Sequence, residues 1–201
     1  MAKDQMFSQM NQAALARLAG RDPREIAHNA GVRYEVETQV FHIPTMGMDV
    51  TVHYPDYSLT PELPGWHSLV ILHYLDLADG FPLTGKEIPF GQMKSGMVRG
   101  GGIDRRSELA IQKLKNLSED TLAKLCKNIG GEAIASNADM AYRIPFLPNF
   151  PVTLKIWLPD EDFPASGRLL LDASADHYLT IEDAVTVAEI ILETITQEEF
   201  L

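Results

Sequence analysis

The sequence predicts an α+β fold, in which a largely antiparallel sheet packs against several helices. Apolar side chains recur at helical spacing in some segments and alternate with polar ones in others. These segments are also grouped, because clusters of strands are separated by runs of helices, and this order is typical of α+β proteins rather than of regular βαβ winding. We expect one domain over residues 1–201, with a helical segment (1–31) and a mixed α+β core (32–201).

Two helices are expected near the N-terminus. Apolar residues at helical spacing predict a helix over 5–19, and Gly20 is placed to end it. A second helix should follow Asp22, whose side chain can cap it, with Pro23 at the first helical position. Gly31 can adopt the left-handed conformation that ends this second helix.

Residues 33–54 change period and predict a hairpin with one solvent-exposed face. Apolar and polar side chains alternate over 48–54, and residues 44–47 can reverse the chain. Residues 68–78 are apolar nearly all the way round, so we expect them to form a central buried helix. The Pro- and Gly-containing segment 81–90 predicts a loop with a short edge strand.

The glycines at 100–102 predict a flexible bend, because glycine is unfavourable inside a helix. Beyond this bend, apolar stripes at helical spacing predict a helix over 110–117 and another over 122–129. Ser118 is placed to cap the second of them.

Strands are expected again in the last third of the chain. Alternation predicts one over 152–157, and a short apolar run predicts a buried one over 168–172. Thr180 and Asp183 have the spacing of a capping box and precede a long apolar stripe. Residues 181–195 therefore predict an amphipathic C-terminal helix.

Charge and cysteine content argue against several classes of function. The chain has 28 acidic and 17 basic side chains, which gives a formal net charge of −11. This charge repels phosphate backbones and anionic lipids, so no nucleic acid and no membrane partner is expected. The single cysteine, Cys126, has no partner for a disulfide or a metal cluster and falls on the apolar side of its helix, where it should be inert. Because no apolar run suits a signal peptide or a membrane span, we expect a cytoplasmic protein.

The densest group of acidic side chains lies in the segment 159–183. Crowded carboxylates repel one another, and a divalent cation bound by oxygen ligands would offset this repulsion. One interpretation is a divalent metal site with the ligands Asp160, Asp162, Asp172 and His177. The other is that the carboxylates lie on a solvated turn and cap nearby backbone groups. The spacing does not match an EF-hand, and no other cofactor is indicated.

His73 lies in the most apolar of the predicted helices, where an imidazole needs a hydrogen-bonding partner. Asp76 cannot readily supply one, because residues three apart share a helix face only in part. His73 is therefore either a functional acid or base, which can titrate near neutral pH, or a satisfied core histidine.

Thr84, Gly85 and Lys86 resemble the end of a phosphate-binding loop, but the full spacing of that motif is missing, so we expect no nucleotide site. We expect instead that this loop, the His73 helix and the acidic loop meet in a pocket for a small molecule. Apolar walls with a few polar groups on loops are typical of such pockets. The candidate ligand-binding residues are His73, Tyr74, Thr84, Lys86, Asp172, Asp176 and His177.

Two stretches of the chain carry a family resemblance. The first stretch contains Ile71–Leu75, Pro82–Lys86 and Phe90. The second contains Trp157, Asp160–Ala165, Leu171–Leu179 and Glu182–Asp183. Together they resemble the prokaryotic family known as domain of unknown function 3786. The resemblance implies a setting in anaerobes, close to corrinoid, one-carbon and iron–sulfur metabolism, and it implies no reaction. The lone Cys126 differs from the cysteine-rich segment that some members carry.

Three functions follow as alternatives. The leading hypothesis is a non-catalytic accessory or small-ligand-binding protein that forms a homodimer. The second is a hydrolase or lyase in which a metal ion at the acidic loop and His177 activates water. The third is a structural module that binds a protein partner through an exposed apolar patch. No catalytic residue is assigned.

Overall fold

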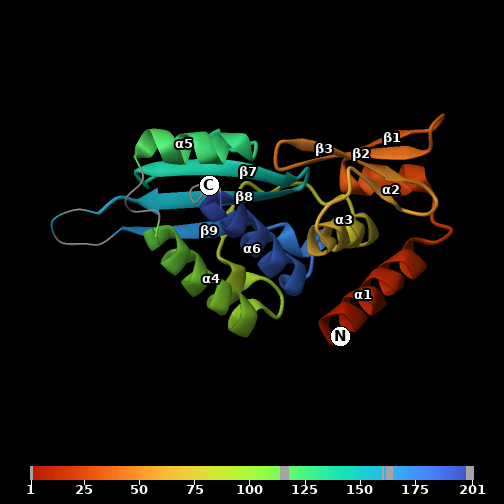
Figure 1. The fold of residues 1–201 in the computed structure, drawn as a ribbon, viewed down its shortest axis with the longest axis horizontal. Coiled ribbons are helices and arrows are strands. Elements are labelled where there is room, and N and C mark those ends of the chain that lie inside the picture. The colour runs from red at the N-terminus through yellow and green to blue at the C-terminus, as the bar shows by residue number, and fades with distance from the viewer. Residues whose placement is uncertain (1, 114–117, 160, 162–164, 198–201) are drawn as a thin grey trace.

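A computed structural model describes residues 2–113, 118–159, 161 and 165–197, which form helices and two antiparallel sheets (Figure 1). The predicted α+β class is confirmed. The helices are α1 (Ala2–Leu18), α2 (Pro23–Ala30), α3 (Gly65–Leu77), α4 (Gly96–Lys113), α5 (Glu119–Asn128) and α6 (Ile181–Gln197), with short 3-10 turns η1 (Phe90–Gln92) and η3 (Ala175–His177). The strands are β1 (Arg33–Glu35), β2 (Val40–Thr45), β3 (Met48–His53), β4 (Leu59–Thr60), β5 (Glu87–Ile88), β6 (Glu132–Ala133), β7 (Met140–Leu147), β8 (Phe150–Trp157) and β9 (Ser166–Asp172).

The first sheet has the strand order β1-β2-β3-β4, and the second has the order β5-β9-β8-β7-β6. Strands β2 and β3 are the predicted hairpin, and β5 is the predicted edge strand. The two sheets meet where the backbone N–H of Met46 donates to the carbonyl of Pro145 at 3.1 Å. Beside this contact, a Cβ on Gly130 would lie 2.8 Å from the nitrogen of Gly47, so glycine is required for the close approach.

Helices cover both faces of the second sheet (Figure 1). Helix α5 lies on one face, and α4 and α6 lie on the other. Helix α3 packs against α1, α2 and α6, and every residue from Leu69 to Leu75 is buried, which confirms the central buried helix. Ala184, Val187 and Ile191 of α6 are buried in the same core. Within the described residues, no helix combines the length and the apolar character that crossing a membrane requires.

The predicted helix ends of the N-terminal segment agree with the structure. Gly20 follows α1 with φ of 75°, and Gly31 ends α2 with φ of 64°. The carboxylate of Asp22 accepts the backbone N–H of Arg24 at 2.9 Å, as a helix cap does. Ser118 caps α5 in the same way. Local side-chain chemistry therefore decides where these helices begin and end.

The predicted bend at Gly100–Gly102 is wrong, because all three glycines lie inside α4. Gly100 is needed for packing: a Cβ there would be 2.4 Å from the carbonyl carbon of Phe90, so α4 can approach η1 only where it has no side chain. A Cβ at Gly101 or Gly102 would meet no atom within 4 Å. Helix α4 thus begins well before the predicted helix 110–117, of which residues 114–117 lie outside the described part.

Candidate functional site

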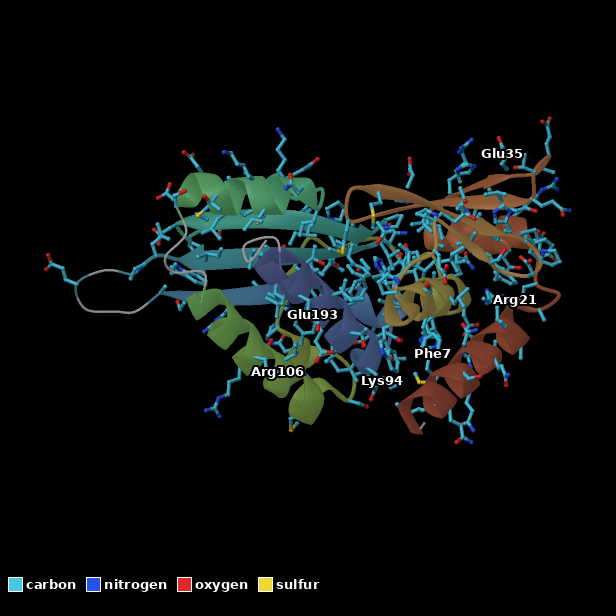
Figure 2. All side chains as sticks on the ribbon, viewed as in Figure 1. Phe7, Arg21, Glu35, Lys94, Arg106 and Glu193 are labelled. Atoms are coloured by element: carbon cyan, nitrogen blue, oxygen red, sulfur yellow. The ribbon has the colours of Figure 1, made fainter. Side chains whose placement is uncertain are left out.

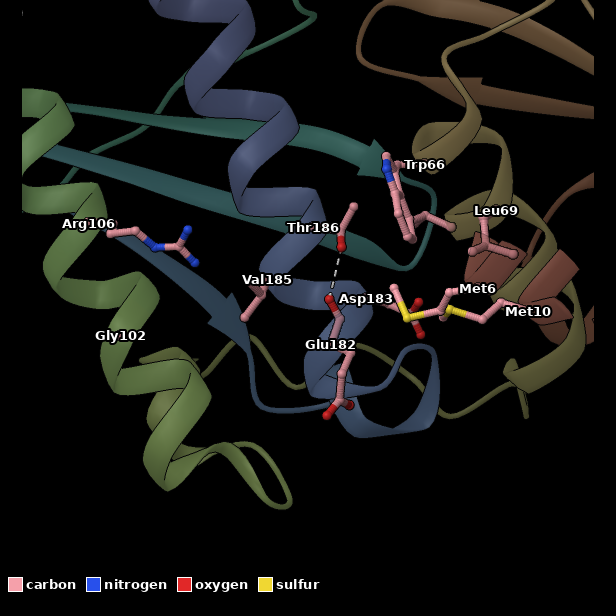
Figure 3. Close-up of a pocket in the computed structure, with 11 residues that line it drawn as sticks. Met6, Met10, Trp66, Leu69, Gly102, Arg106, Glu182, Asp183, Val185 and Thr186 are labelled. Carbon is pink, nitrogen blue, oxygen red and sulfur yellow. Dashed lines mark hydrogen bonds between the residues drawn. The ribbon is translucent and has the colours of Figure 1, made fainter. Parts of the chain in front are cut away.

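A pocket of about 520 Å³ lies between α1, α3, α4 and α6 (Figure 3), and we call it the apolar pocket. Its apolar lining comes from three of these helices: Met6, Met10, Trp66, Leu69, Val70 and Val185. Its other lining residues come from α4 and α6: Gly102, Arg106, Glu182, Asp183 and Thr186. Four helices that are distant in sequence therefore supply one apolar surface with a few polar groups.

A buried pair of side chains joins α3 to α6 beside the apolar pocket, which Asp183 itself lines. His73 and Asp183 are 8% and 5% exposed, and His73 Nδ1 donates to Asp183 Oδ1 at 2.6 Å. The second carboxylate oxygen of Asp183 accepts the hydroxyl of Thr180 at 2.7 Å, so the predicted capping pair of α6 is present. Asp76 instead bonds to Arg17, at 2.5 Å. His73 thus finds its partner on α6, 110 residues away in the sequence.

A second cavity of about 360 Å³ lies at the start of α6, and we call it the polar hollow. It is lined by Leu77, Asp79, Lys94, Ser95, Asp176, His177, Leu179, Thr180, Ile181 and Glu182. His177 Nδ1 donates to Asp79 Oδ2 at 2.7 Å, and this hydrogen bond lowers the pKa of Asp79. The imidazole of His177 stacks on the ring of Phe81, with 3.9 Å between ring centroids and 6° between planes. Two contacts therefore fix the orientation of the His177 ring.

Asp172 holds the loop that resembles a phosphate-binding loop. Its carboxylate accepts the backbone N–H groups of Thr84, Gly85 and Ser174 at 2.9, 2.7 and 2.9 Å, and the Thr84 hydroxyl at 2.8 Å. Burial alone would raise the pKa of Asp172, but these hydrogen bonds, led by the one from the Thr84 backbone, lower it to about 2. The donors that would bind a phosphate are thus used by a carboxylate of the same chain.

The structure brings part of the predicted ligand site together. Asp176 and His177 line the polar hollow, and both carboxylate oxygens of Asp176 lie near the backbone N–H of Lys94, at 3.0 and 3.1 Å. Asp172 and Thr84 bond to each other and line neither cavity. The acidic loop and the loop after α3 are therefore adjacent, as expected, but their hydrogen bonds hold the loops to each other.

The other predicted ligand-binding residues line neither cavity. Tyr74 is fully buried, and its hydroxyl donates to the carbonyl of Ala30 at 2.6 Å and accepts the N–H of Asn149 at 3.0 Å, so it links three parts of the core. Lys86 is exposed. His73 is bonded to Asp183 and lies one helical turn before Leu77, which does line the polar hollow.

The proposed metal ligands are not gathered in the described part of the chain. Asp160 and Asp162 lie outside the described residues. In the ranges that the structure does describe, no three His, Cys, Asp or Glu side chains are grouped so as to hold an ion. Asp172 is occupied by four hydrogen-bond donors, and His177 uses one ring nitrogen for Asp79. The divalent metal site stays a prediction.

Sequence reasoning missed several residues of these cavities. Asp79 lines the polar hollow, but it follows the end of α3 and precedes Gly80, and this pair indicates only a turn. Ser95 carried no motif, although it has φ of 61°, which is uncommon for a residue with a Cβ. Met6 and Met10 were expected on an apolar helix face, but nothing in their spacing shows that the face borders a cavity. These assignments depend on which segments meet in the fold.

The structure defines an α+β protein with an apolar cavity between helices and a more polar one at the start of α6. The chain belongs to the family described as domain of unknown function (DUF3786), whose sequence model matches residues 22–194, so the resemblance is confirmed. No curated protein and no solved structure matches the chain. The polar hollow lies wholly within the matched residues, whereas Met6 and Met10 of the apolar pocket lie before them.

Proposed function

We propose that this protein binds a small ligand with an apolar body in the apolar pocket. The observation that carries the proposal is the cavity of about 520 Å³, whose walls are mainly apolar and whose few polar groups come from α4 and α6. Pockets for small molecules measure about 300–1,000 Å³ and combine apolar walls with a few polar groups that orient the ligand. The apolar pocket has both properties.

Helix α1 is held in the position that completes the pocket. Figure 2 shows Phe7 on the side of α1 that faces α3, where its ring packs edge-on against Trp66 with 5.4 Å between centroids. Near the other end of the helix, Arg17 bonds to the side chain of Asp76, and Arg21 donates to the carbonyl of Asp76 at 2.8 Å. The pocket therefore has a fixed wall on this side, and the unbranched side chains of its two methionines can adapt to a ligand.

Two glycines in α4 provide a matched pair of variants to test the proposal. A Cβ at either Gly101 or Gly102 meets no atom within 4 Å, but only Gly102 lines the pocket. Gly102→Leu should place its side chain in the cavity, whereas Gly101→Leu makes the same change in helix propensity without filling it. We expect ligands to bind the unchanged protein and Gly101→Leu alike, and to bind Gly102→Leu at least about tenfold more weakly, a loss of about 1.4 kcal/mol.

Binding can be measured in a Trp157→Phe background, in which Trp66 is the remaining tryptophan. Small aromatic and branched aliphatic compounds are screened for a change in Trp66 fluorescence and for a rise in melting temperature, which binding to the folded state must cause. Equal affinity for the two glycine variants would place the ligand elsewhere. A screen in which no compound changes either signal would reject the proposal.

Two further proposals are that the protein forms a homodimer and, from the family resemblance, that it works in anaerobic corrinoid or iron–sulfur metabolism. Light scattering on the purified chain measures the first directly, because a dimer has twice the mass of the monomer. The protein-partner alternative has one observation in its favour, since Met97, Phe81 and Leu83 are 87%, 40% and 42% exposed. A monomer that binds compounds in the pocket would favour the ligand-binding function over this alternative.

A further inference from the structure

We propose that the polar hollow is an acyl-transfer site, in which Ser95 is the nucleophile, His177 the general base and Asp79 the residue that positions His177. This activity is separate from ligand binding in the apolar pocket and does not depend on it. The arrangement rests on three features of the described residues: a histidine held in one orientation, a serine hydroxyl without a bonding partner, and a cavity that both residues line.

The contacts of His177 leave one ring nitrogen available to act as a base. The Nδ1 atom donates to Asp79 Oδ2 at 2.7 Å, which makes Nε2 the acceptor of the neutral imidazole. Asp79 is fixed in turn, because its Oδ1 accepts the backbone N–H of Phe81 at 3.0 Å, and the ring of Phe81 stacks on the imidazole. No described residue bonds to Nε2. A carboxylate that orients a histidine in this way is the arrangement that serine hydrolases use.

The loop that carries Ser95 is tied to the loop that carries His177. The backbone N–H of Lys94 bonds to the carboxylate of Asp176, and the next residue along each loop, Ser95 and His177, lines the polar hollow. Ser95 has the left-handed φ of 61°, an uncommon conformation for a residue with a Cβ that occurs in turns and at functional sites. No described residue hydrogen-bonds to its hydroxyl. The two side chains do not bond to each other in this structure, and such bonds commonly tighten only when substrate is bound.

The surroundings of the two residues suit a small ester. Leu77, Leu179 and Ile181 give the cavity an apolar side, which suits a short acyl chain. Helix α4 begins at the residue after Ser95, so the positive end of its dipole is on the same side of the cavity as the Ser95 hydroxyl and favours negative charge there. The charged side chains that also line the cavity are Lys94, Asp79, Asp176 and Glu182.

The proposed reaction is the hydrolysis of an ester and needs only water as a second substrate. Ser95 Oγ attacks the carbonyl carbon while His177 Nε2 takes the hydroxyl proton. The bond from that carbon to the leaving oxygen then breaks, and the leaving alcohol receives the proton from His177. Water attacks the resulting ester of Ser95 with His177 again as base, which releases the carboxylic acid and restores the serine.

The test uses a fluorophosphonate probe, which reacts covalently with activated serines, together with hydrolysis of p-nitrophenyl acetate by the full chain. We expect the probe on the peptide that contains Ser95, and we expect Ser95→Ala to abolish both labelling and turnover. Ser136→Ala is the matched control, because Ser136 is also exposed and lies in a different loop. The Gly101→Leu variant should hydrolyse the ester normally, because Gly101 lines neither cavity.

Two further variants test the roles of the other residues. His177→Ala should lower turnover by at least about 100-fold, and added imidazole should restore part of it, which a purely structural role would not allow. Asp79→Asn should lower kcat while KM changes little, because Asp79 acts through His177 and does not touch the substrate. The proposal is overturned if Ser95 is not labelled, if Ser95→Ala hydrolyses the ester as fast as Ser136→Ala, or if imidazole has no effect on His177→Ala.

Discussion

The apolar pocket and the polar hollow lie along the same helix but are built in different ways. Leu69 of α3 lines the first and Leu77 lines the second, while His73 lies between them and bonds to Asp183. The pocket is formed by helix faces, and the packing of apolar side chains keeps these helices in place. The hollow is lined by loop residues together with the end of α3 and the start of α6, and the carboxylate of Asp176 ties two of its loops together by accepting the backbone N–H of Lys94. Apolar helix faces suit binding, whereas fixed polar groups on loops suit chemistry.

The largest expected effect on stability comes from breaking the buried pair of His73 and Asp183. Asp183→Ala leaves His73 buried without a partner and removes a cap of α6, so we expect the free energy of unfolding to fall by about 2–4 kcal/mol. Urea denaturation at neutral pH measures it. Asp22→Ala is the control, because Asp22 caps α2 at an exposed position and its loss should cost about 1 kcal/mol. An equal cost for the two variants would show that the pair with His73 contributes nothing beyond the cap.

A smaller effect is expected where α4 supports the loop of the polar hollow. A Cβ at Gly100 would overlap the backbone of Phe90, so Gly100→Ala should lower stability by about 1–3 kcal/mol. Gly101→Ala has open space and should raise stability by about 0.8–1 kcal/mol through its helix propensity. Thermal unfolding of both variants measures the difference. Changes of the same sign would contradict the close contact between α4 and η1.

The pH dependence of stability should reveal the carboxylate that holds the loop at Thr84. The pKa of Asp172 is lowered from 3.8 to about 2, so its charged form stabilises the fold above pH 4, and this contribution is lost as the pH falls from about 4 to about 2. Asp172→Asn should remove this dependence and cost roughly 1–2 kcal/mol at neutral pH, after allowance for solvent screening.

His67 provides an internal reference for that experiment. Burial lowers its pKa to about 4, so stability should also fall as the pH drops from 6.5 to about 4, because the unfolded chain gains a proton that the folded chain excludes. Asp172→Asn should leave this upper range unchanged. Acid titrations followed by circular dichroism separate the two ranges, and a variant that alters only the upper one would contradict the assignment to Asp172.

The smallest effect is expected at the apolar pocket, where Arg106 bonds to Glu189 at 2.5 Å. Both side chains are largely exposed, at 57% and 41%, so solvent screens the pair. Arg106→Ala should change the free energy of unfolding by no more than about 0.5 kcal/mol. A loss above 1 kcal/mol in urea denaturation would mean that the pocket wall depends on this ion pair.

Much of the fold could be predicted because its signals are local. Asp22, Gly31 and Ser118 act at helix ends through contacts with the nearest turn, so their residue types are sufficient evidence. Gly100 was misinterpreted as part of a bend. It is required because α4 packs closely against Phe90, which lies outside that helix. Periodicity describes one segment at a time and gives no information on what that segment packs against.

The candidate site was predictable only in part for the same reason. That the loop at Thr84 and the acidic loop would meet was expected, and the sequence left open whether these carboxylates bind a metal ion or cap backbone groups. In the structure Asp172 accepts four hydrogen bonds, three of them from backbone N–H groups. His73 was correctly expected to need a partner, and that partner, Asp183, lies 110 residues away. A polar group's need for a bond is a property of its residue type, but the choice of partner depends on the packing.

By itself the sequence determined the α+β class, the central buried helix, the amphipathic helix at the C-terminal end and most of the helix caps, because hydrophobic periodicity and capping act over a few neighbouring residues. Tertiary structure alone decided that α1 and α6 border one pocket, that Asp79 orients His177, and that Asp183 satisfies His73. Cavities and buried pairs join residues that are far apart in the chain, so they exist only once the helices and loops have packed together.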